Sequence, residues 1–173
     1  MKKTVLFFLL SFAVLLPALD IDLHQYRVRN GKYEFTREGE DKMVKIYSLP
    51  KVRSCYVTYN VPVTPGHKYE LSFEMRGKDL VKRPSKSLFG AGVTFNAKGK
   101  IIYRGSQLGR WKHALGTFDW QKVVIKFTAP DTKEAYLCCE TADADGWAEF
   151  RRVKLTDLSA ETKAPAAKTP EKK

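Results

Sequence analysis

The sequence contains few of the residues and motifs from which common active sites are built. It has three histidines, and none has a second histidine or a cysteine at the spacing of a zinc site. It also lacks the Gly-x-Ser-x-Gly nucleophile motif and a glycine loop that would cradle phosphate. The adjacent Cys138 and Cys139 do not have the C-x-x-C spacing of a redox pair. Sequence motifs therefore give no support to zinc, serine-hydrolase, nucleotide-binding or dithiol chemistry.

Cysteine is scarce as well, and the three residues, Cys55, Cys138 and Cys139, are an odd number. The strand alternation described below places Cys55 and Cys139 on core-facing positions and Cys138 on the opposite face. In an oxidising compartment one bridge, Cys55–Cys139, and one spare thiol are expected. The alternative is three free thiols that pack as small hydrophobic residues.

A long hydrophobic run is also absent. The apolar stretch from Thr4 to Leu16 follows Lys2 and Lys3 and gives way to Asp20. It is shorter than the ~20 residues that span a bilayer, and its layout is typical of a cleavable signal peptide. We therefore expect residues 1–18 to be removed on export to a periplasmic or extracellular location, with no transmembrane segment afterwards. The alternative is an uncleaved N-terminal anchor.

The C-terminal residues 159–173 contain alanine, proline, lysine, threonine and glutamate, without any aromatic residue. Such a segment cannot bury enough apolar surface to offset its ordering entropy, which predicts a disordered tail. Residues 19–158 remain as one domain with a core of its own.

The chain carries a formal charge of +12, of which +8 remains when residues 1–18 and the tail are set aside. A basic exported domain is attracted to anionic surfaces such as acidic polysaccharides or envelope polymers. The alternative is that the charge serves solubility alone.

The domain shows the period-two pattern of half-buried strands. In residues 67–76, Tyr69, Leu71, Phe73 and Met75 alternate with polar residues. The same reading predicts strands over residues 32–36, 43–48, 54–63, 67–76, 90–96, 100–104, 122–128, 134–140 and 147–155. Along the last of these the apolar phase changes, which predicts a bulge near Arg151 and Arg152. About nine short strands without an amphipathic helix indicate an all-β antiparallel sandwich.

The order of motifs resembles that of secreted carbohydrate-binding modules, the jelly-roll domains with a galactose-binding-like fold that accompany cellulases and xylanases. The segment from Val63 to Phe73, closed by Arg76-Gly77, is similar to their V-x-P-G-x-x-Y-x-L-S-F … R-G strand. Residues 117–130 resemble their T-x-x-W … F-T-A-P segment. The resemblance covers residues 31–158 and implies a jelly roll in which Trp120 is a core residue.

The chain departs from this family in its last strand. Such modules commonly have two aspartates there, one of which helps to hold a structural calcium ion, whereas this sequence has Arg151 and Arg152. Guanidinium groups cannot ligate calcium, which binds oxygen. We expect no cofactor; calcium held by backbone carbonyls with Asp22 or Glu38 is the alternative.

Glycoside hydrolysis needs two acidic groups, and the sequence contains two candidate pairs of carboxylates. Glu70 and Glu74 share a strand face, and Glu140 and Glu149 lie on two strands that could be neighbours. Nothing in the sequence distinguishes their environments, so we expect no enzymatic activity.

Sugar binding is the favoured interpretation, because aromatic rings stack on sugar rings while polar side chains bond the hydroxyls. One group of candidates lies in the loop around Trp111, with Tyr103, Arg104 and Arg110. A second group is expected on the outer face of one sheet, where the resembled modules usually hold glycan chains. It comprises Trp147, Tyr136, Glu140, Glu74 and Arg76.

The sequence thus predicts an exported, non-catalytic carbohydrate-binding domain whose partner is a polysaccharide or other glycan, with a preference for acidic chains. The alternative is a structural or adaptor sandwich that docks to cell-envelope or protein partners. No specific nucleic-acid binding is expected.

Overall fold

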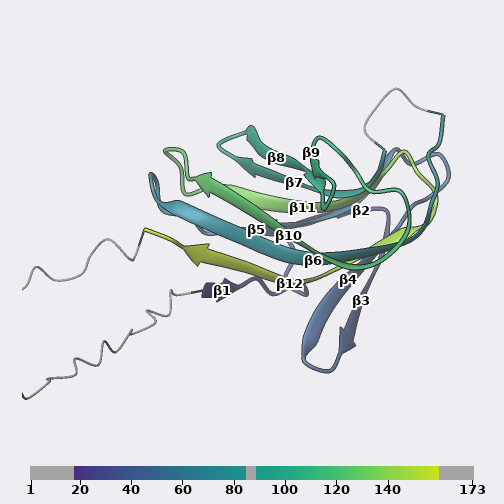
Figure 1. Ribbon diagram of the computed structural model, residues 1–173, viewed down its shortest axis with the longest axis horizontal. Helices are drawn as coiled ribbons and strands as arrows, with labels where there is room; N and C mark the ends of the chain where they lie inside the picture. Colours follow the sequence, from purple (N-terminus) through teal and green to yellow (C-terminus); the bar gives the residue numbers. More distant parts are fainter. Residues whose placement is uncertain (1–17, 85–88, 160–173) are drawn as a thin grey trace, which may run out of the picture.

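The strands form two antiparallel sheets packed face to face (Figure 1). The computed structural model describes residues 18–84 and 89–159. Sheet I has the order β10 (Gly116–Thr128), β6 (Lys68–Leu80), β12 (Trp147–Asp157), β4 (Asp41–Tyr47) and β3 (Lys32–Glu38), with β1 (Ala18–Asp20) paired to β12. Sheet II has the order β2 (Val28–Asn30), β5 (Ser54–Asn60), β11 (Ala135–Ala142), β7 (Gly90–Ala97), β8 (Lys100–Ser106) and β9 (Gly109–Arg110).

This architecture confirms the predicted all-β sandwich. Each of the nine predicted strands is present, with ends shifted by a few residues. The three strands that were not predicted, β1, β2 and β9, have two or three residues each. Such short strands do not show a period-two pattern, so they left no signal in the sequence.

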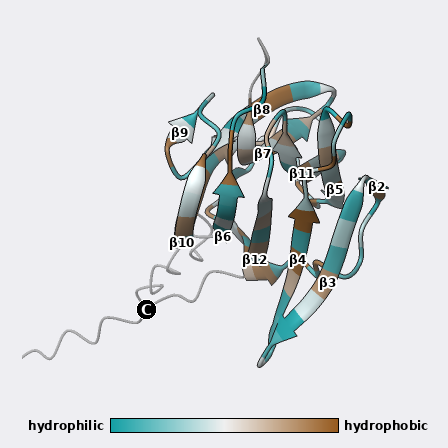
Figure 2. Cartoon of the chain, turned by 90° about the vertical axis from the view of Figure 1, so that its right-hand side faces the viewer, coloured by the Kyte–Doolittle hydropathy of each residue, from teal (hydrophilic) through white to brown (hydrophobic). Residues whose placement is uncertain are grey.

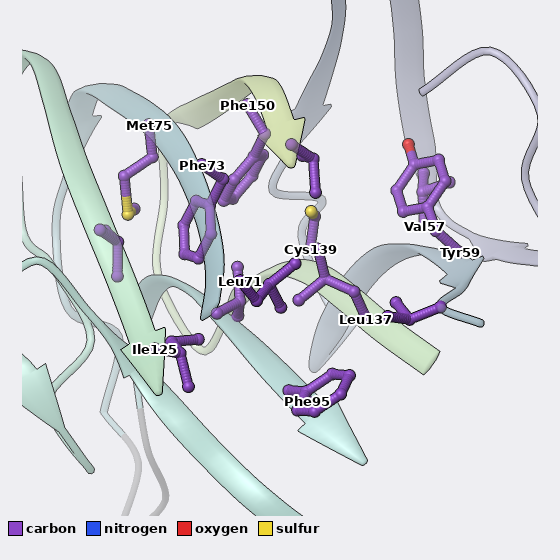
Figure 3. Packing of buried hydrophobic residues seen from close by; sticks show 14 of the residues in the cluster. Val57, Tyr59, Leu71, Phe73, Met75, Phe95, Ile125, Leu137, Cys139 and Phe150 are labelled. Atoms are coloured by element: carbon purple, nitrogen blue, oxygen red, sulfur yellow. The ribbon is translucent and has the colours of Figure 1, made fainter. Parts of the chain in front are cut away.

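The core lies between the sheets and is built from the predicted inward-facing positions. Figure 2 shows hydrophobic and hydrophilic bands along single strands such as β4 and β6, as expected for strands with one buried face. Figure 3 shows the rings of Phe73 and Phe150 from sheet I near Leu137 and Cys139 from sheet II. The Phe73 and Phe150 ring centroids are 6.5 Å apart, and both side chains are buried.

The predicted bulge in the last strand is confirmed. The pairing of β12 with β6 shifts between Arg151 and Lys154, and Arg152 has a φ of 52°. The extra residue allows Phe150 and Val153 both to face the core although they are three positions apart.

The predicted Cys55–Cys139 bridge is wrong, because all three cysteines are free thiols in the structure. Cys55 and Cys139 both face the core on neighbouring strands, as expected. However, the register pairs Cys55 with Thr141 and Cys139 with Val57, so the two thiols are diagonal neighbours. Diagonal positions are about 7–8 Å apart, beyond comfortable disulfide geometry.

The predicted signal peptide and the predicted tail lie almost entirely outside the described residues. Only Ala18 of the former, and Ser159 of the latter, are described. Within residues 18–84 and 89–159 there is no helix that could cross a bilayer.

Candidate functional site

The outer face of sheet II carries a hollow of about 570 Å³, which we call the sheet II hollow. Strands β5, β11, β7 and β8 form its floor, and β2 forms one side. Because alternate residues of a strand face the same side, the hollow is lined by the non-core positions of these strands. They are Arg27, Val28, Ser54, Tyr56, Thr58, Thr94, Asn96, Arg104, Tyr136, Cys138 and Glu140.

Glu140 is a carboxylate fixed in the floor of this hollow, and only 5% of its surface is exposed. Thr94 Oγ1 donates a hydrogen bond to Glu140 Oε1 at 2.8 Å, and Ser54 Oγ donates to Oε2 at 3.2 Å. The two hydroxyls come from β7 and β5, the strands on either side of β11. Glu140 therefore ties three strands together on the outer face of the sheet.

The guanidinium of Arg104 and the imidazole ring of His113 lie next to the Glu140 carboxylate. Arg104 Nη2 lies 3.6 Å and His113 Nε2 lies 3.5 Å from Glu140 Oε1. Burial alone would raise the pKa of Glu140, but His113, the Thr94 hydroxyl and Arg104 together hold that pKa below its usual value. The carboxylate is thus ionised at neutral pH and its charge is neutralised within the protein.

Two aromatic side chains line the hollow near this polar centre: Tyr56 is the register partner of Glu140, and Tyr136 lies four residues before Glu140 on β11. Tyr136 and Tyr56 are both half-buried and project from β11 and β5 into the hollow. The Arg27 guanidinium lies 5.6 Å from the centroid of the Tyr136 ring. Among the described residues Arg27 has no carboxylate partner, so its charge is available to a ligand.

The depression continues beyond Tyr136. Arg27 also lines a second hollow of about 560 Å³, together with Asn60, Pro62, Lys133 and Glu134. Asn60 and Tyr136 are register partners on β5 and β11. The two hollows therefore follow the same pair of strands, and the site is elongated along them.

Three of the predicted site residues, Arg104, Tyr136 and Glu140, meet in the sheet II hollow. Tyr103, Arg110 and Trp111 do not line it. Tyr103 packs against the core and donates a hydrogen bond to the Ser106 carbonyl at 2.9 Å. Arg110 ends β9 and Trp111 follows it, and both are exposed.

The placement of Trp147, Glu74 and Arg76 on the same face as Tyr136 and Glu140 is wrong. The first three lie on β12 and β6 of sheet I, whereas the last two lie on β11 of sheet II. Sequential order along the chain did not reveal this, because β11 and β12 are consecutive strands that belong to different sheets. For the same reason Glu140 and Glu149 are not neighbours.

Trp120 is not a core residue, contrary to the expectation from the resemblance. It is half-buried on β10, with the Arg151 guanidinium 3.9 Å and the Arg76 guanidinium 4.6 Å from its ring centroid. Arg76 in turn bonds Glu149 at 2.5 Å, and Arg151 bonds Glu74 at 2.8 Å. On the outer face of sheet I, the Trp120 ring and the two carboxylates are therefore already occupied by arginine side chains of the protein itself.

The region in which a calcium ion was considered does not fit that ion. Asp22 pairs with Lys42, and Glu38 lies 3.5 Å from Arg151. Arg152 pairs with Asp41 at 2.8 Å. Hydrogen bonds from these cations also lower the pKa of Asp22 and of Asp41. The oxygen ligands that calcium requires are therefore engaged by lysine and arginine side chains.

Several residues of the hollow were missed by the sequence reading. Tyr56, Thr58, Thr94 and Asn96 lie between core-facing positions on two predicted strands, so alternation alone could have placed them on an outer face. Arg27 precedes a strand too short to be predicted, and no sequence signal identified it.

No protein-family model matches this sequence, and no curated protein matches it. Solved structures do match it. The C-terminal family 6 carbohydrate-binding module of LamC, a marine laminarinase of Zobellia galactanivorans, has a TM-score of 0.52 at 12% identity, covering 81% of this chain and 99% of that module. A family 4 carbohydrate-binding module has a TM-score of 0.51 at 13% identity, covering 82% of this chain and 86% of the other.

A third structure is the family 6 module of Cellvibrio mixtus lichenase 5A in complex with cellotriose. Its TM-score is 0.50 at 13% identity, and the match covers 80% of this chain and 95% of the module. At such identities the likeness is one of fold. Together with the observed two-sheet architecture, these matches show that the chain has the jelly-roll fold of carbohydrate-binding modules.

Proposed function

We propose that this protein is an exported, non-catalytic carbohydrate-binding domain and that the sheet II hollow binds an acidic glycan chain. The observation that carries the proposal is the hollow itself, which is lined by two tyrosine rings and by a fixed polar centre. Tyrosine rings supply apolar area for the faces of sugar rings, and the polar groups between them can bond hydroxyls. Modules of the same fold, one of them in complex with cellotriose, support this interpretation.

The preference for an acidic chain follows from the charges along the hollow. Arg27 and Lys133 line its two halves, and Glu134 is the only carboxylate among the lining residues besides Glu140. Arg104 and His113 already compensate Glu140. The positive charges of Arg27 and Lys133 therefore remain for the ligand, and they favour a carboxylate or sulfate group. A guanidinium can bond such a group in a bidentate manner.

The non-catalytic role is proposed because the sheet II hollow itself contains one carboxylate, Glu140, whereas glycoside hydrolysis uses a pair, and Glu134 of the adjoining hollow is an exposed side chain. Glu140 is fixed by two hydroxyl donors and lies beside Arg104 and His113, and its pKa is lowered, which makes it a poor general acid. We also propose that the domain works without a metal ion.

Affinity electrophoresis through gels that contain polygalacturonate or neutral hydroxyethylcellulose tests this proposal. We expect the wild-type protein to be retarded more strongly by the acidic polymer. Tyr136→Ala should weaken binding about tenfold or more, because it removes a central aromatic contact. Arg27→Gln should reduce the preference for the acidic polymer while leaving the neutral one unaffected.

Trp147→Ala is the matched control, because it removes an aromatic residue from the outer face of sheet I. It should bind like the wild type. Retardation by neither polymer in a folded protein would contradict the proposal, as would loss of binding in Trp147→Ala but not in Tyr136→Ala.

Cys138 offers an independent test, because its side chain lines the hollow while Cys55 and Cys139 are buried in the core. Burial and the nearby Glu140 raise the pKa of the Cys138 thiol, so little thiolate is present near pH 8. We expect a maleimide to modify Cys138 about tenfold more slowly than a free thiol, and bound polygalacturonate to slow it further. Mass spectrometry with Cys138→Ser as control would measure this; labelling that the polymer does not change would place the ligand elsewhere.

A further inference from the structure

The positive charge of the domain is concentrated in one continuous segment. From Leu80 to Phe118 the sequence contains eight lysines and arginines and no aspartate or glutamate. This surplus equals the net +8 of residues 19–158. The segment includes β7, β8 and β9, which form one edge of sheet II (Figure 1).

The turn over residues 106–112 projects from this edge and is internally braced. Ser106 is buried, and its Oγ donates a hydrogen bond to the Lys112 carbonyl at 2.7 Å and accepts one from the Leu108 amide at 3.2 Å. The Trp111 amide donates to the Arg104 carbonyl at 2.5 Å. The turn is therefore held in one defined shape by its own hydrogen bonds and by the bond to the Arg104 carbonyl of β8.

This braced turn exposes two large apolar side chains. Leu108 is 56% exposed and Trp111 is 49% exposed. Trp111 also has a φ of 63°, a left-handed conformation that is unfavourable for a non-glycine residue. Strain at an exposed aromatic residue points to a role outside the fold of the domain. Arg110 and Lys112 are the neighbours of Trp111 in the sequence, and both are exposed.

We propose that the turn over residues 106–112 docks the domain onto an anionic lipid surface. In this arrangement Leu108 and Trp111 insert at the level of the headgroups, and Arg110 and Lys112 contact lipid phosphates. Tryptophan prefers the membrane interface, and basic residues next to apolar ones give binding that depends on anionic lipid. The segment from Leu80 to Phe118 contains no carboxylate of its own that would repel the lipid phosphates.

The exposed leucine distinguishes a lipid surface from a polysaccharide as the partner of this turn. Aliphatic side chains gain free energy by leaving water for an apolar phase, whereas a polysaccharide surface is largely hydroxylated. Leu115, which follows in the same connection, is 39% exposed as well. The turn also lies outside the lining of the sheet II hollow, so membrane docking and glycan binding are separate properties.

Co-sedimentation with vesicles tests the proposal. The full chain is mixed with phosphatidylcholine vesicles that contain or lack phosphatidylglycerol. We expect binding only when phosphatidylglycerol is present, and a loss of about tenfold or more in the double variant Leu108→Ser/Trp111→Ser. Arg110→Gln and Lys112→Gln should each cost about fivefold, since each basic residue near an anionic surface contributes about 1 kcal/mol.

The matched control is Val124→Ser/Trp147→Ser, which removes an exposed apolar residue and a tryptophan from sheet I. It should bind vesicles like the wild type, and because all variants share the same termini, any contribution of the termini cancels. Tyr136→Ala should also retain vesicle binding, which separates this proposal from glycan binding. Equal binding of wild type and Leu108→Ser/Trp111→Ser to anionic vesicles would overturn the proposal. The proposal would also be overturned if the wild type bound no vesicles. The same holds if Leu108→Ser/Trp111→Ser lost binding to polygalacturonate but kept binding to vesicles.

Discussion

Replacing Glu140 with alanine is expected to lower the free energy of unfolding by about 3–5 kcal/mol. The carboxylate is buried and accepts hydrogen bonds from Thr94 and Ser54. Its removal would leave the buried His113 ring and the half-buried Arg104 guanidinium without their counter-charge. Uncompensated charge in a buried position accounts for most of the cost when one partner of such a pair is removed.

Urea denaturation followed by tyrosine and tryptophan fluorescence would measure this loss. Glu149→Ala provides a matched comparison, because Glu149 is a carboxylate of sheet I that is only 3% exposed and bonds Arg76 of the same sheet. Both variants should lose stability, but only the Glu140 variant should also lose the position of Arg104 and thus glycan binding. A decrease below about 1 kcal/mol for Glu140→Ala would show that the cluster is a solvated surface group.

The contribution of Glu140 should depend on pH in a defined direction. The pKa of Glu140 is lowered in the folded protein below its ordinary value of 4.5, since His113, the Thr94 hydroxyl and Arg104 together outweigh burial. Ionised Glu140 therefore stabilises the folded state above about pH 4.5, and this stabilisation is lost as the pH falls through the lower, folded-state value. The stability difference between wild type and Glu140→Gln should be constant near pH 7 and shrink in acid. A difference that grows on acidification would contradict this assignment.

The fold could be predicted from the sequence because each strand carries its own signal. Alternation places Tyr69, Leu71 and Phe73 on one side whatever strand lies next to them, and the same holds for the core face of β5. Even the bulge at Arg152 was visible as a change of phase in the apolar positions. Local periodicity is enough to define which side of a strand is buried.

The site could be predicted only in part, because its assembly depends on which strands are neighbours. Glu140 and Trp147 are seven positions apart in the chain, yet the chain crosses from sheet II to sheet I between them. Alternation says that both residues face outward but not that they face opposite sides of the molecule. Strand order is set by the packing of the whole sandwich, and no local pattern records it.

The surroundings of large aromatic residues are a second feature that the sequence did not predict. Trp120 has the size and apolar area of a core residue, and the resemblance assigned it to the core. In the structure it lies between Arg76 and Arg151, whose planar guanidinium groups cover its ring. Cation–π contacts of this kind allow a large ring to remain on an outer face, and the sequence separation of the three residues concealed them.

Gly92 provides the second large expected effect, because it is one of the points at which the 106–115 connection rests on sheet II, beside the Ala91–Ala114 bridge. It is the register partner of Glu140, and a Cβ atom at this position would lie 2.1 Å from His113 Cδ2 and 2.6 Å from the Gly105 carbonyl oxygen. A contact with backbone cannot be relieved by moving a side chain. Gly92→Ala is therefore expected to cost about 3 kcal/mol, at the upper end for overpacking.

The same substitution should separate the connection from the sheet. Displacing His113 from β7 removes its contact with Glu140 and loosens the C-terminal end of the turn over residues 106–112. Hydrogen exchange should therefore accelerate in residues 105–115 while the sheet I strands stay protected. Gly39→Ala is the comparison, since a Cβ there meets nothing within 4 Å and only a φ of 61° opposes it. It should cost about 1 kcal/mol. If Gly92→Ala costs no more than Gly39→Ala and leaves exchange unchanged, then the connection is not held in place by the contact of His113 with Gly92.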